Sequence, residues 1–442
     1  MSFSRRNFFR IAGTSLVASY FADVLDPRLL LASTTTSNAT LRNTAKSCIF
    51  IFLPGAPSQT DLWDLKEGSW TPTDLAATSY GNIRWPQGLM PKTGEHLGKL
   101  TLVRSALSWA AVHQLGQVWA QIARNPGGAT GAIAPHMGAV VALESQAART
   151  PSDVLPGFIA LNAGSIPTCG YLPAKYAPFG VTTDESGLST LAHPEGADRF
   201  TRRWDLLHKL DANRTSGALG KPSLDMNDFY DQAKTLMEAP GVNALFTYDD
   251  AEHARYGSTT FGDSLVVARN LVASNKGTRF VQVTLGGWDH HSDIYDKEAA
   301  QSIYAQSAEL DAALAALLAD LESMKLLDST LIVLASEFGR TVGALNGQGG
   351  RDHYLRNSVV FAGGGTKGGR AIGKTDATGA NVVEYGWAPN RDVRPEDVTC
   401  TIYSALGIDY TKIRNDDPLG RGFEYVPFAT EGHYAPIEEL WG

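Results

Sequence analysis

The feature that most constrains the fold is a strand–helix–strand pattern in the second half of the chain. Residues 279–285, RFVQVTL, have the apolar and β-branched composition of a buried strand. Residues 299–327 follow as a long amphipathic helix, and residues 329–338, STLIVLASEF, predict a second buried strand. The helical face is predicted to carry Ile303, Leu310, Leu314, Leu317, Leu321 and Met324. Such βαβ units build parallel sheets with right-handed crossovers.

Further strand-like runs lie elsewhere in the chain, at residues 48–55, 100–106, 157–163 and 357–365. Residues 134–145, APHMGAVVALES, predict a helix between two of them. From about 162 to 260 the pattern weakens into loops and one helical run at 224–237, which we interpret as an excursion from the core. The sequence therefore predicts an α/β protein with a mostly parallel sheet, and one domain over residues 36–442.

The N-terminal segment has the composition of an export signal. In SRRNFFRIAGTSLVASYF, Arg5 and Arg6 precede a modest apolar stretch that Gly13, Thr14 and Ser15 interrupt, which makes it too weak for a membrane span. We interpret residues 1–35 as a twin-arginine signal with its linker, which predicts the export machinery as a partner and a periplasmic or secreted location. The alternative is an N-terminal helix of the folded domain.

Charge and cysteine content exclude some classes of function. The net charge is −8 and the sequence contains no basic block, so we expect no nucleic-acid partner. Three scattered cysteines are too few for a disulfide framework or a cysteine-rich zinc site. Cys48 and Cys400 are expected to be small core residues.

Polar residues follow the two strands of the βαβ unit. Asp289, His290 and His291, in the motif GGWDHHSD, come after the first strand, and Glu337 comes after the second. Because parallel strands end at the same edge of a sheet, where ligands of α/β proteins bind, these residues are expected to lie together. On an extended segment Asp289, His291 and Asp293 point to one side, while His290 faces away.

Imidazole and carboxylate groups in this pattern suit a divalent metal such as zinc, iron or manganese. Asp352 and His353 precede the strand at 357–365, and an antiparallel direction of that strand would bring them to the same edge. The alternative for the histidine loop is a hydrogen-bonded turn whose histidines cap strand ends. For Glu337 the choice is between a ligand or catalytic role and a structural ion pair with Arg340.

Several other residues are candidates for the same edge. Ser58 and Thr60, after the first strand, are candidate nucleophiles, although turn and helix-cap roles are common for such residues. Arg104 and His113 follow another strand and are expected to line the cleft and bind substrate. His136 is expected to cap or pack a helix. The glycine-rich run 362–376 lacks the phosphate-loop spacing and predicts a turn between strands.

Taken in order, these motifs resemble the alkaline phosphatase superfamily, and within it the exported, sulfatase-like bacterial family known as domain of unknown function 1501. The matching segments are SRRNFFR, LPGAPSQTDLWD, LVRSA, GGWDHHSD, SEFGRT, GRDHY, AGGGTKGGRAIGKTD and DVTCTIYSALGID. The resemblance implies an alkaline-phosphatase-like three-layer α/β/α sandwich that hydrolyses phosphate or sulfate esters. It also implies that Asp289 and His291 form one metal-binding pair, that Glu337 is the acid of a second pair, and that His353 is the final histidine.

The sequence departs from the active members of that superfamily at two positions. Pro54 and Gly55 stand where a metal-binding aspartate is expected, and Phe338 stands where the second histidine would be. One metal position is therefore predicted to be intact and the second to be lost unless Asp61 substitutes for the missing ligand, which argues against two-metal displacement chemistry.

The leading functional hypothesis is an exported, metal-dependent hydrolase acting on a small-molecule or glycan ester. One divalent ion (zinc, iron, manganese or calcium) is expected on Asp289, His291 and His353, with Asp352 and Glu337 as further ligands. Arg340 or Arg104 would hold the anion, and Ser58, Thr60 or water would attack. The alternatives are a non-catalytic envelope protein that binds a sulfated or acidic glycan through the same cleft, and an envelope scaffold protein.

Overall fold

The computed structural model describes residues 39–189, 191, 193, 195–211 and 221–442. The chain divides into two compact units, Met1–Ala39 and Thr40–Gly442, and every element named below lies in the second. The predicted export signal at residues 1–35 lies outside the described residues.

An eight-stranded sheet forms the centre of the second unit, in the order β12-β4-β11-β8-β1-β7-β5-β6. Its strands are β1 (Ser47–Phe52), β4 (Leu100–Leu107), β5 (Phe158–Leu161), β6 (Phe179–Val181), β7 (Phe280–Thr284), β8 (Thr330–Ala335), β11 (Arg356–Gly363) and β12 (Arg370–Ile372). The strand β11 is antiparallel to both of its neighbours, whereas the other pairs are parallel. The predicted mostly parallel sheet is therefore confirmed, and the strand after His353 has the antiparallel direction on which the placing of His353 depended.

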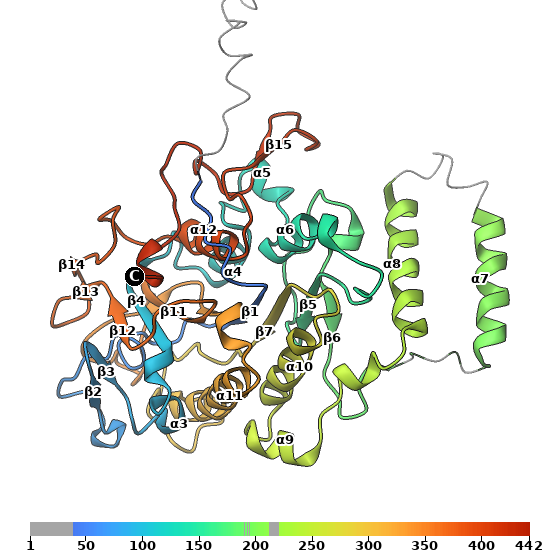
Figure 1. Ribbon diagram of the computed structural model, residues 1–442. Helices are drawn as coiled ribbons and strands as arrows, with labels where there is room; N and C mark the ends of the chain where they lie inside the picture. The colour runs from blue at the N-terminus through green and yellow to red at the C-terminus, as the bar shows by residue number, and fades with distance from the viewer. Residues whose placement is uncertain (1–38, 190, 192, 194, 212–220) are drawn as a thin grey trace, which may run out of the picture. The chain divides into compact units, whose positions relative to one another are not determined.

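Helices cover both faces of this sheet, which gives the predicted three-layer α/β/α sandwich (Figure 1). Helices α10 (Thr260–Ser274) and α11 (Ile303–Ser323) pack on the face of the inner strands that carries Ile49 and Ile51. Helices α4 (His113–Ile122), α6 (Met137–Glu144) and α12 (Pro395–Ala405) cover the opposite face. There Gly138 allows α6 to approach the sheet closely, since a Cβ atom at this position would lie 2.6 Å from the ring of Phe280.

The predicted βαβ unit is present, with β1 inserted between its two strands. Register pairs Phe52 with Thr284 of β7 on one side and with Ala335 of β8 on the other, so the three strands end together. The face predicted for α11 is buried except at its last member, where the prediction is wrong. The helix ends at Ser323, and Met324 is 44% exposed because it is the C-cap residue.

Helix α10 was not predicted from sequence, although eleven of its residues are buried. Its apolar residues occupy almost all sides, so it lacks the amphipathic period that identifies a surface helix. Inside the excursion at 162–260, β6 adds the edge strand of the main sheet.

The remaining helices and short strands surround this core. The helices are α3 (Pro91–Gly94), α5 (Ala129–Ala132), α7 (Ala197–Asp211), α8 (Lys221–Glu238) and α9 (Asp250–Arg255). The 3-10 turns are Thr73–Leu75, Leu97–Lys99, Gln146–Ala148, Ala174–Tyr176, Asn243–Leu245, Leu327–Ser329 and Glu438–Leu440. The short strands are β2 (Thr78–Tyr80), β3 (Ile83–Trp85), β9 (Gly339–Arg340), β10 (His353–Tyr354), β13 (Lys374–Thr375), β14 (Val382–Glu384), β15 (Ile413–Arg414) and β16 (Phe423–Glu424).

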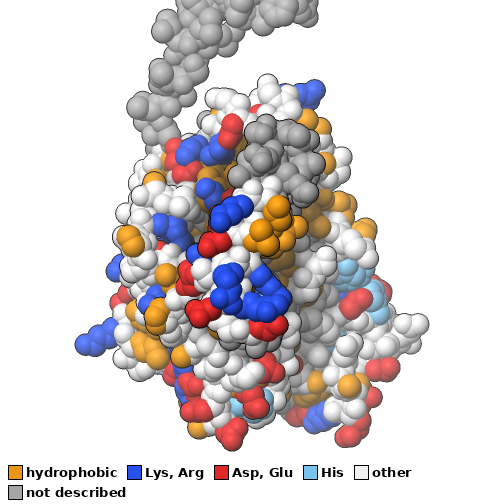
Figure 2. Space-filling view, turned by 90° about the vertical axis from the view of Figure 1, so that its right-hand side faces the viewer, with side chains coloured by type: hydrophobic (Ala, Val, Ile, Leu, Met, Phe, Trp, Pro, Cys, Tyr) orange, Lys and Arg blue, Asp and Glu red, His pale blue; other side chains and the backbone are white. Residues whose placement is uncertain are grey.

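Two further sequence predictions are confirmed. The glycine-rich run at 362–376 turns from β11 into β12, and Cys48 and Cys400 are free, buried core residues. Across the described part of the chain, we find no helix with both the length and the apolar character needed to cross a bilayer. On the face shown in Figure 2, acidic and basic side chains lie close to one another.

Candidate metal centre

Four segments meet at the carboxyl edge of the sheet. The loops after β7 and β8 carry Asp289, His291 and Glu337, and both strands end level with β1. Because β11 runs the opposite way, the residues before it, including His353, reach the same edge. The fourth segment is the start of α4, where His113 is the first helical residue.

Four side chains converge there, and we call His113, Asp289, His291 and His353 the histidine cluster. Each offers one ligand atom, and these atoms all lie within 4.8 Å of one another. Oδ1 of Asp289 lies 3.2 Å from Nε2 of His113, 3.2 Å from Nε2 of His291 and 3.8 Å from Nε2 of His353. Nε2 of His291 and Nε2 of His353 are 2.9 Å apart.

Each imidazole of the histidine cluster has an acceptor for its other nitrogen. Nδ1 of His113 lies 2.7 Å from Oε1 of Glu337, and Nδ1 of His291 lies 3.2 Å from Oδ1 of Asp352. Nδ1 of His353 lies 2.8 Å from the carbonyl oxygen of Ala111. A proton on each Nδ1 satisfies these acceptors, so all three Nε2 lone pairs then point into the cluster.

This arrangement fits a divalent metal. Nε2 of His113 is buried and has no hydrogen-bond partner among the described residues. Three converging nitrogen lone pairs and a carboxylate repel one another unless a cation lies between them. Metal-binding histidines typically donate their second nitrogen to a carboxylate or carbonyl, as all three do here. The donor set suits zinc, iron or manganese.

Glu337 lies behind His113, outside the four converging ligand atoms. Its side chain is buried and accepts hydrogen bonds from the backbone of Gly55 at 2.8 Å and from Gln117 at 3.2 Å, besides the contact with His113. The hydroxyl of Ser336 donates to its second oxygen at 2.9 Å. These contacts occupy both carboxylate oxygens, and the geometry gives Glu337 the part of a residue that orients His113.

Arg340 is fully buried at the edge of the histidine cluster. Among the described residues, its ion-pair partner is Asp289 and not Glu337. Its guanidinium donates to the backbone carbonyls of Gly55, Ala56 and Arg351. It also donates to Oδ1 of Asp289, and one amino group lies 3.2 Å from Nε2 of His291. Arg340 thus ties three loops together and places a permanent positive charge beside the cluster.

The charges around the cluster shift its ionisation in the metal-free protein. The hydrogen bond to Glu337 raises the pKa of His113, whereas burial lowers the pKa of His353. Burial raises the pKa of Asp289, but the hydrogen bond and charge of Arg340 outweigh it, and the net shift is downward. Asp289 therefore remains a carboxylate well into acid, as a metal ligand must.

The missing aspartate of the first strand has a steric cause. Gly55 has a φ of +107°, and a Cβ atom there would lie 2.8 Å from the backbone nitrogen of Asp289 and 2.9 Å from that of Trp288. No side chain fits at this position while the loop after β7 keeps its course. The backbone of this loop therefore fills the space that a side chain at position 55 would need.

The two candidate nucleophiles are buried next to the site. The hydroxyl of Ser58 donates to Asp61 at 2.6 Å, and the hydroxyl of Thr60 is buried without a hydrogen-bond partner among the described residues. Asp61 is fully buried and also accepts from Arg351 at 2.7 Å and from Tyr295 at 2.7 Å. In this arrangement Ser58 belongs to a structural network around Asp61.

Other predicted residues lie apart from the histidine cluster. The guanidinium of Arg104 donates to the carbonyl of Gly373 at 3.0 Å and lies 3.7 Å from Asp64. His290 is buried and Asp293 is not one of the four converging side chains. His136 caps α6 as predicted, with Nδ1 accepting from the amide of Gly138 at 2.8 Å.

The sequence did not identify His113 as a member of the histidine cluster. It was expected to bind substrate instead. Its signal was weak: a single histidine at the start of a helix, 176 residues before Asp289 (289 − 113). One turn further along α4, Gly116 lies against Glu337, since a Cβ atom there would lie 3.0 Å from Cβ of Glu337. This close approach of α4 to the end of β8 places His113 at the site.

Comparison with known proteins gives one family match and distant structural similarities. A family model described as "Protein of unknown function (DUF1501)" matches residues 45–427. No curated protein shows significant similarity to the chain. A sulfatase from Pseudoalteromonas sp. has 12% identity and a TM-score of 0.39, over 82% of this chain and 68% of its own.

Two further solved structures are similar at the same level. A phosphonate monoester hydrolase from Silicibacter pomeroyi has 12% identity and a TM-score of 0.39, over 88% of this chain and 77% of its own. Alkaline phosphatase from the Antarctic bacterium TAB5 has 15% identity and a TM-score of 0.32, over 73% of this chain and 92% of its own. At these identities the similarity concerns the fold alone.

Proposed function

The chain belongs to the DUF1501 family of proteins of unknown function, and we propose that it is a metal-dependent hydrolase of phosphate or sulfate esters. One divalent metal is held by His113, Asp289, His291 and His353. The three nitrogen donors favour zinc, iron or manganese over calcium, which takes oxygen ligands.

One observation carries this proposal: all three histidines use Nδ1 for an acceptor outside the cluster and turn Nε2 inward. A polar surface loop has no need to fix three tautomers in the same sense. An arrangement of this kind costs free energy without a bound cation, because like lone pairs face one another and the buried Nε2 of His113 has no hydrogen-bond partner among the described residues.

In this proposal a bound metal supplies Lewis acidity, which polarises an ester oxygen and stabilises the charge of the transition state. Glu337 holds His113 in position, and Asp352 does the same for His291. Arg340 contributes a positive electrostatic potential but has no N–H group left to donate to the substrate, because its guanidinium already donates to groups of the protein. Because the Ser58 hydroxyl donates to Asp61, the attacking group in this proposal is water. Its oxygen bonds to phosphorus or sulfur as the bond from that atom to the ester oxygen breaks, and the proton that the water loses ends on the leaving oxygen.

A second candidate function is the non-catalytic binding of an acidic ligand. It is favoured by Arg340, whose guanidinium already contacts Asp289 and His291. A fixed cation there neutralises part of the cluster and leaves less need for a metal. This candidate predicts ligand binding without turnover.

The test is the metal content and esterase activity of the untagged protein, purified without chelator. We expect about one equivalent of metal by inductively coupled plasma mass spectrometry, and its loss in the double variant Asp289→Ala/His353→Ala. The matched control is His208→Ala, which removes an exposed histidine of α7 and should retain the metal. Hydrolysis is measured with p-nitrophenyl phosphate, bis-p-nitrophenyl phosphate and p-nitrophenyl sulfate.

The outcomes separate the two functions. Stoichiometric metal with turnover that the double variant abolishes supports the hydrolase. Metal without turnover of any ester class supports a binding protein. A wild-type protein that takes up no zinc, iron or manganese would overturn the proposal, and would leave the histidines with a structural role.

A further inference from the structure

A partly exposed tryptophan is held rigidly on the segment that leads into the histidine cluster. The indole nitrogen of Trp109 donates to Glu396 at 2.9 Å, and that of Trp119 donates to the other oxygen of the same carboxylate at 2.8 Å. Glu396 is itself buried at the start of α12. Trp109 nevertheless remains 41% exposed. A fixed aromatic ring that is left open to solvent is a ready surface for a ligand.

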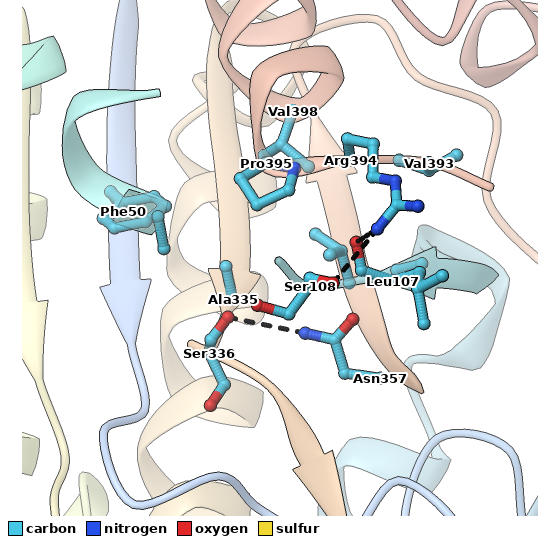
Figure 3. Close-up of a pocket in the computed structure, with 13 residues that line it drawn as sticks. Phe50, Leu107, Ser108, Ala335, Ser336, Asn357, Val393, Arg394, Pro395 and Val398 are labelled. Atoms are coloured by element: carbon cyan, nitrogen blue, oxygen red, sulfur yellow. Dashed lines mark hydrogen bonds between the residues drawn. The ribbon is translucent and has the colours of Figure 1, made fainter. Parts of the chain in front are cut away.

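The guanidinium of Arg394 packs against the ring of Trp109. It lies 3.9 Å from the centre of that ring. One amino group donates to the carbonyls of Leu107 and Ser108 at 3.2 Å and 3.0 Å, as Figure 3 shows. The cavity under this contact has a volume of only about 20 Å³, room for about one water molecule. Trp109 also stacks on Trp119, with ring centroids 6.0 Å apart, so its ring is fixed by two neighbours and offers a ligand the part that stays exposed.

A second exposed aromatic residue faces the same region from the C-terminal part of the chain. Phe428 is 53% exposed and has a φ of +58°, a conformation that costs free energy in a residue other than glycine. Glu424 holds this turn by accepting from the backbone of Phe428 at 3.2 Å and from the hydroxyl of Thr430 at 3.2 Å. This turn therefore keeps the side chain of Phe428 exposed to solvent, in a backbone conformation that costs free energy.

Trp109, Phe428 and Tyr434 together line two open hollows of about 510 and 360 Å³, and we call this region the aromatic cleft. Its rim is polar and of mixed charge, with Asp392, Glu431 and His433 on one side and Asn125, Thr130 and Glu424 on the other. Burial and nearby carboxylates raise the pKa of Tyr434 to about 12, so its hydroxyl stays a hydrogen-bond donor.

The aromatic cleft lies next to the histidine cluster. Trp109 precedes His113 by four residues, which limits the distance between their Cα atoms to about 14 Å. Between them, the carbonyl of Ala111 accepts from Nδ1 of His353. A short segment of the chain thus joins Trp109 to the cluster, while the two hollows themselves are lined by none of its four side chains.

We infer that the aromatic cleft is a saccharide-binding site. A sugar ring has one apolar face of C–H groups and a margin of hydroxyls that both donate and accept hydrogen bonds. The fixed aromatic walls match the apolar face, and the mixed acidic, basic and neutral rim matches the hydroxyls. That the bound saccharide carries the ester to be cleaved rests on the function proposed above, whereas the binding itself does not.

The test is binding of the fluorescently labelled full-length protein to an array of neutral, uronic-acid-containing and sulfated oligosaccharides, measured with and without EDTA. We expect binding to at least one class, and dissociation constants raised by about tenfold or more in Trp109→Ala and in Phe428→Ala. Trp109→Phe should retain part of the affinity because it keeps an aromatic face. The matched control is Phe229→Ala on α8, which removes a phenylalanine of similar exposure, 46%.

Thermal unfolding of each variant separates loss of the fold from loss of the contact. Phe428→Ala serves as the second variant because the Phe428 side chain makes no hydrogen bond that its removal would break. The inference is wrong if the wild-type protein binds no oligosaccharide, or if both aromatic variants bind as well as the wild type. Binding that EDTA abolishes would place the saccharide on the cluster alone and would also overturn it. Because turnover is not measured, failure of the hydrolase proposal leaves this result unaffected.

Discussion

Nδ1 of His113 lies 2.7 Å from Oε1 of Glu337, although 224 residues separate the two in the chain. The contact joins the first residue of α4 to the loop after the central strand β8. It turns Nε2 of His113 toward Asp289 and so completes the histidine cluster. The metal site thus depends on a buried carboxylate that is not among its four ligands.

Replacement of Glu337 by glutamine should weaken metal binding without unfolding the protein. The glutamine oxygen can still accept from Nδ1 of His113, but it carries no negative charge, so it holds the imidazole less tightly and makes it a weaker ligand. We expect the affinity for zinc to fall by about 10- to 100-fold, as for other residues that orient metal ligands. Competition with a chromogenic chelator measures it. Glu396→Gln, at another buried glutamate, should bind zinc as tightly as the wild type, and equal affinities in all three proteins would contradict the assignment.

Restoring an aspartate at position 55 should not create a second metal site. A side chain at Gly55 collides with the backbone of Trp288 and Asp289, and the φ of +107° adds strain. We expect Gly55→Asp to lower the melting temperature by several degrees and to leave the metal content at or below one equivalent. Gly180→Asp is the control, since a Cβ atom there meets nothing within 4 Å. A stable variant that binds two equivalents of metal would contradict this prediction, because it would show that the loop after β7 can move to make room for the side chain.

Arg340 should resist even the conservative change to lysine. A lysine keeps the charge but cannot donate to three separate carbonyls and to Asp289 at once, which leaves buried acceptors unpaired. We expect a loss of about 3 kcal/mol or more in the free energy of unfolding. Arg84→Lys, at an exposed ion pair with Glu67, should change it by less than about 1 kcal/mol. Denaturant titration measures both, and similar losses would contradict the prediction.

Buried His136 should make the protein sensitive to mild acid. Burial lowers its pKa to about 3, from about 6.5 in an unfolded chain. Between these values the unfolded state binds the proton and the folded state does not, so stability falls as the pH falls through this range. Between pH 7 and pH 5 the contribution is about 2 kcal/mol.

The variant His136→Asn tests this pH dependence, because asparagine keeps an acceptor for the amide of Gly138 at the start of α6. Unfolding free energies at pH 7 and pH 5 should differ by about 2 kcal/mol less in this variant than in the wild type. His208→Asn, at an exposed position, should follow the wild type. An unchanged difference in His136→Asn would show that His136 takes up a proton in the folded state.

The approach of Asp289 and His291 to Glu337 could be anticipated because it follows from topology, whereas that of His353 depended on the direction of β11, which the sequence left open. The apolar periodicity around residues 279–338 indicates a βαβ unit, and parallel strands necessarily end at one edge. The loops after such strands meet whatever the details of packing. The α/β class with a mostly parallel sheet could be predicted for the same reason, whereas the three-layer α/β/α sandwich was implied by the family resemblance.

Some helices could be predicted from the sequence and others could not. The amphipathic face of α11 was readable from sequence, whereas α10 is buried on almost every side and shows no clear period. The C-cap at Met324 was missed because the end of a helix depends on where the next turn begins.

The sequence by itself determined the alternation of strands and helices, and hence the edge of the sheet at which polar residues gather. Only the tertiary structure decided that His113 joins Asp289, that Glu337 stands behind it, and that Trp109 and Phe428 line one cleft. The physical reason is one of range: periodicity is a local property of the chain, whereas these contacts depend on how α4, the β7 loop and the C-terminal turn pack. That packing is set by close approaches at Gly55 and Gly116, where a Cβ atom would clash with a neighbouring segment.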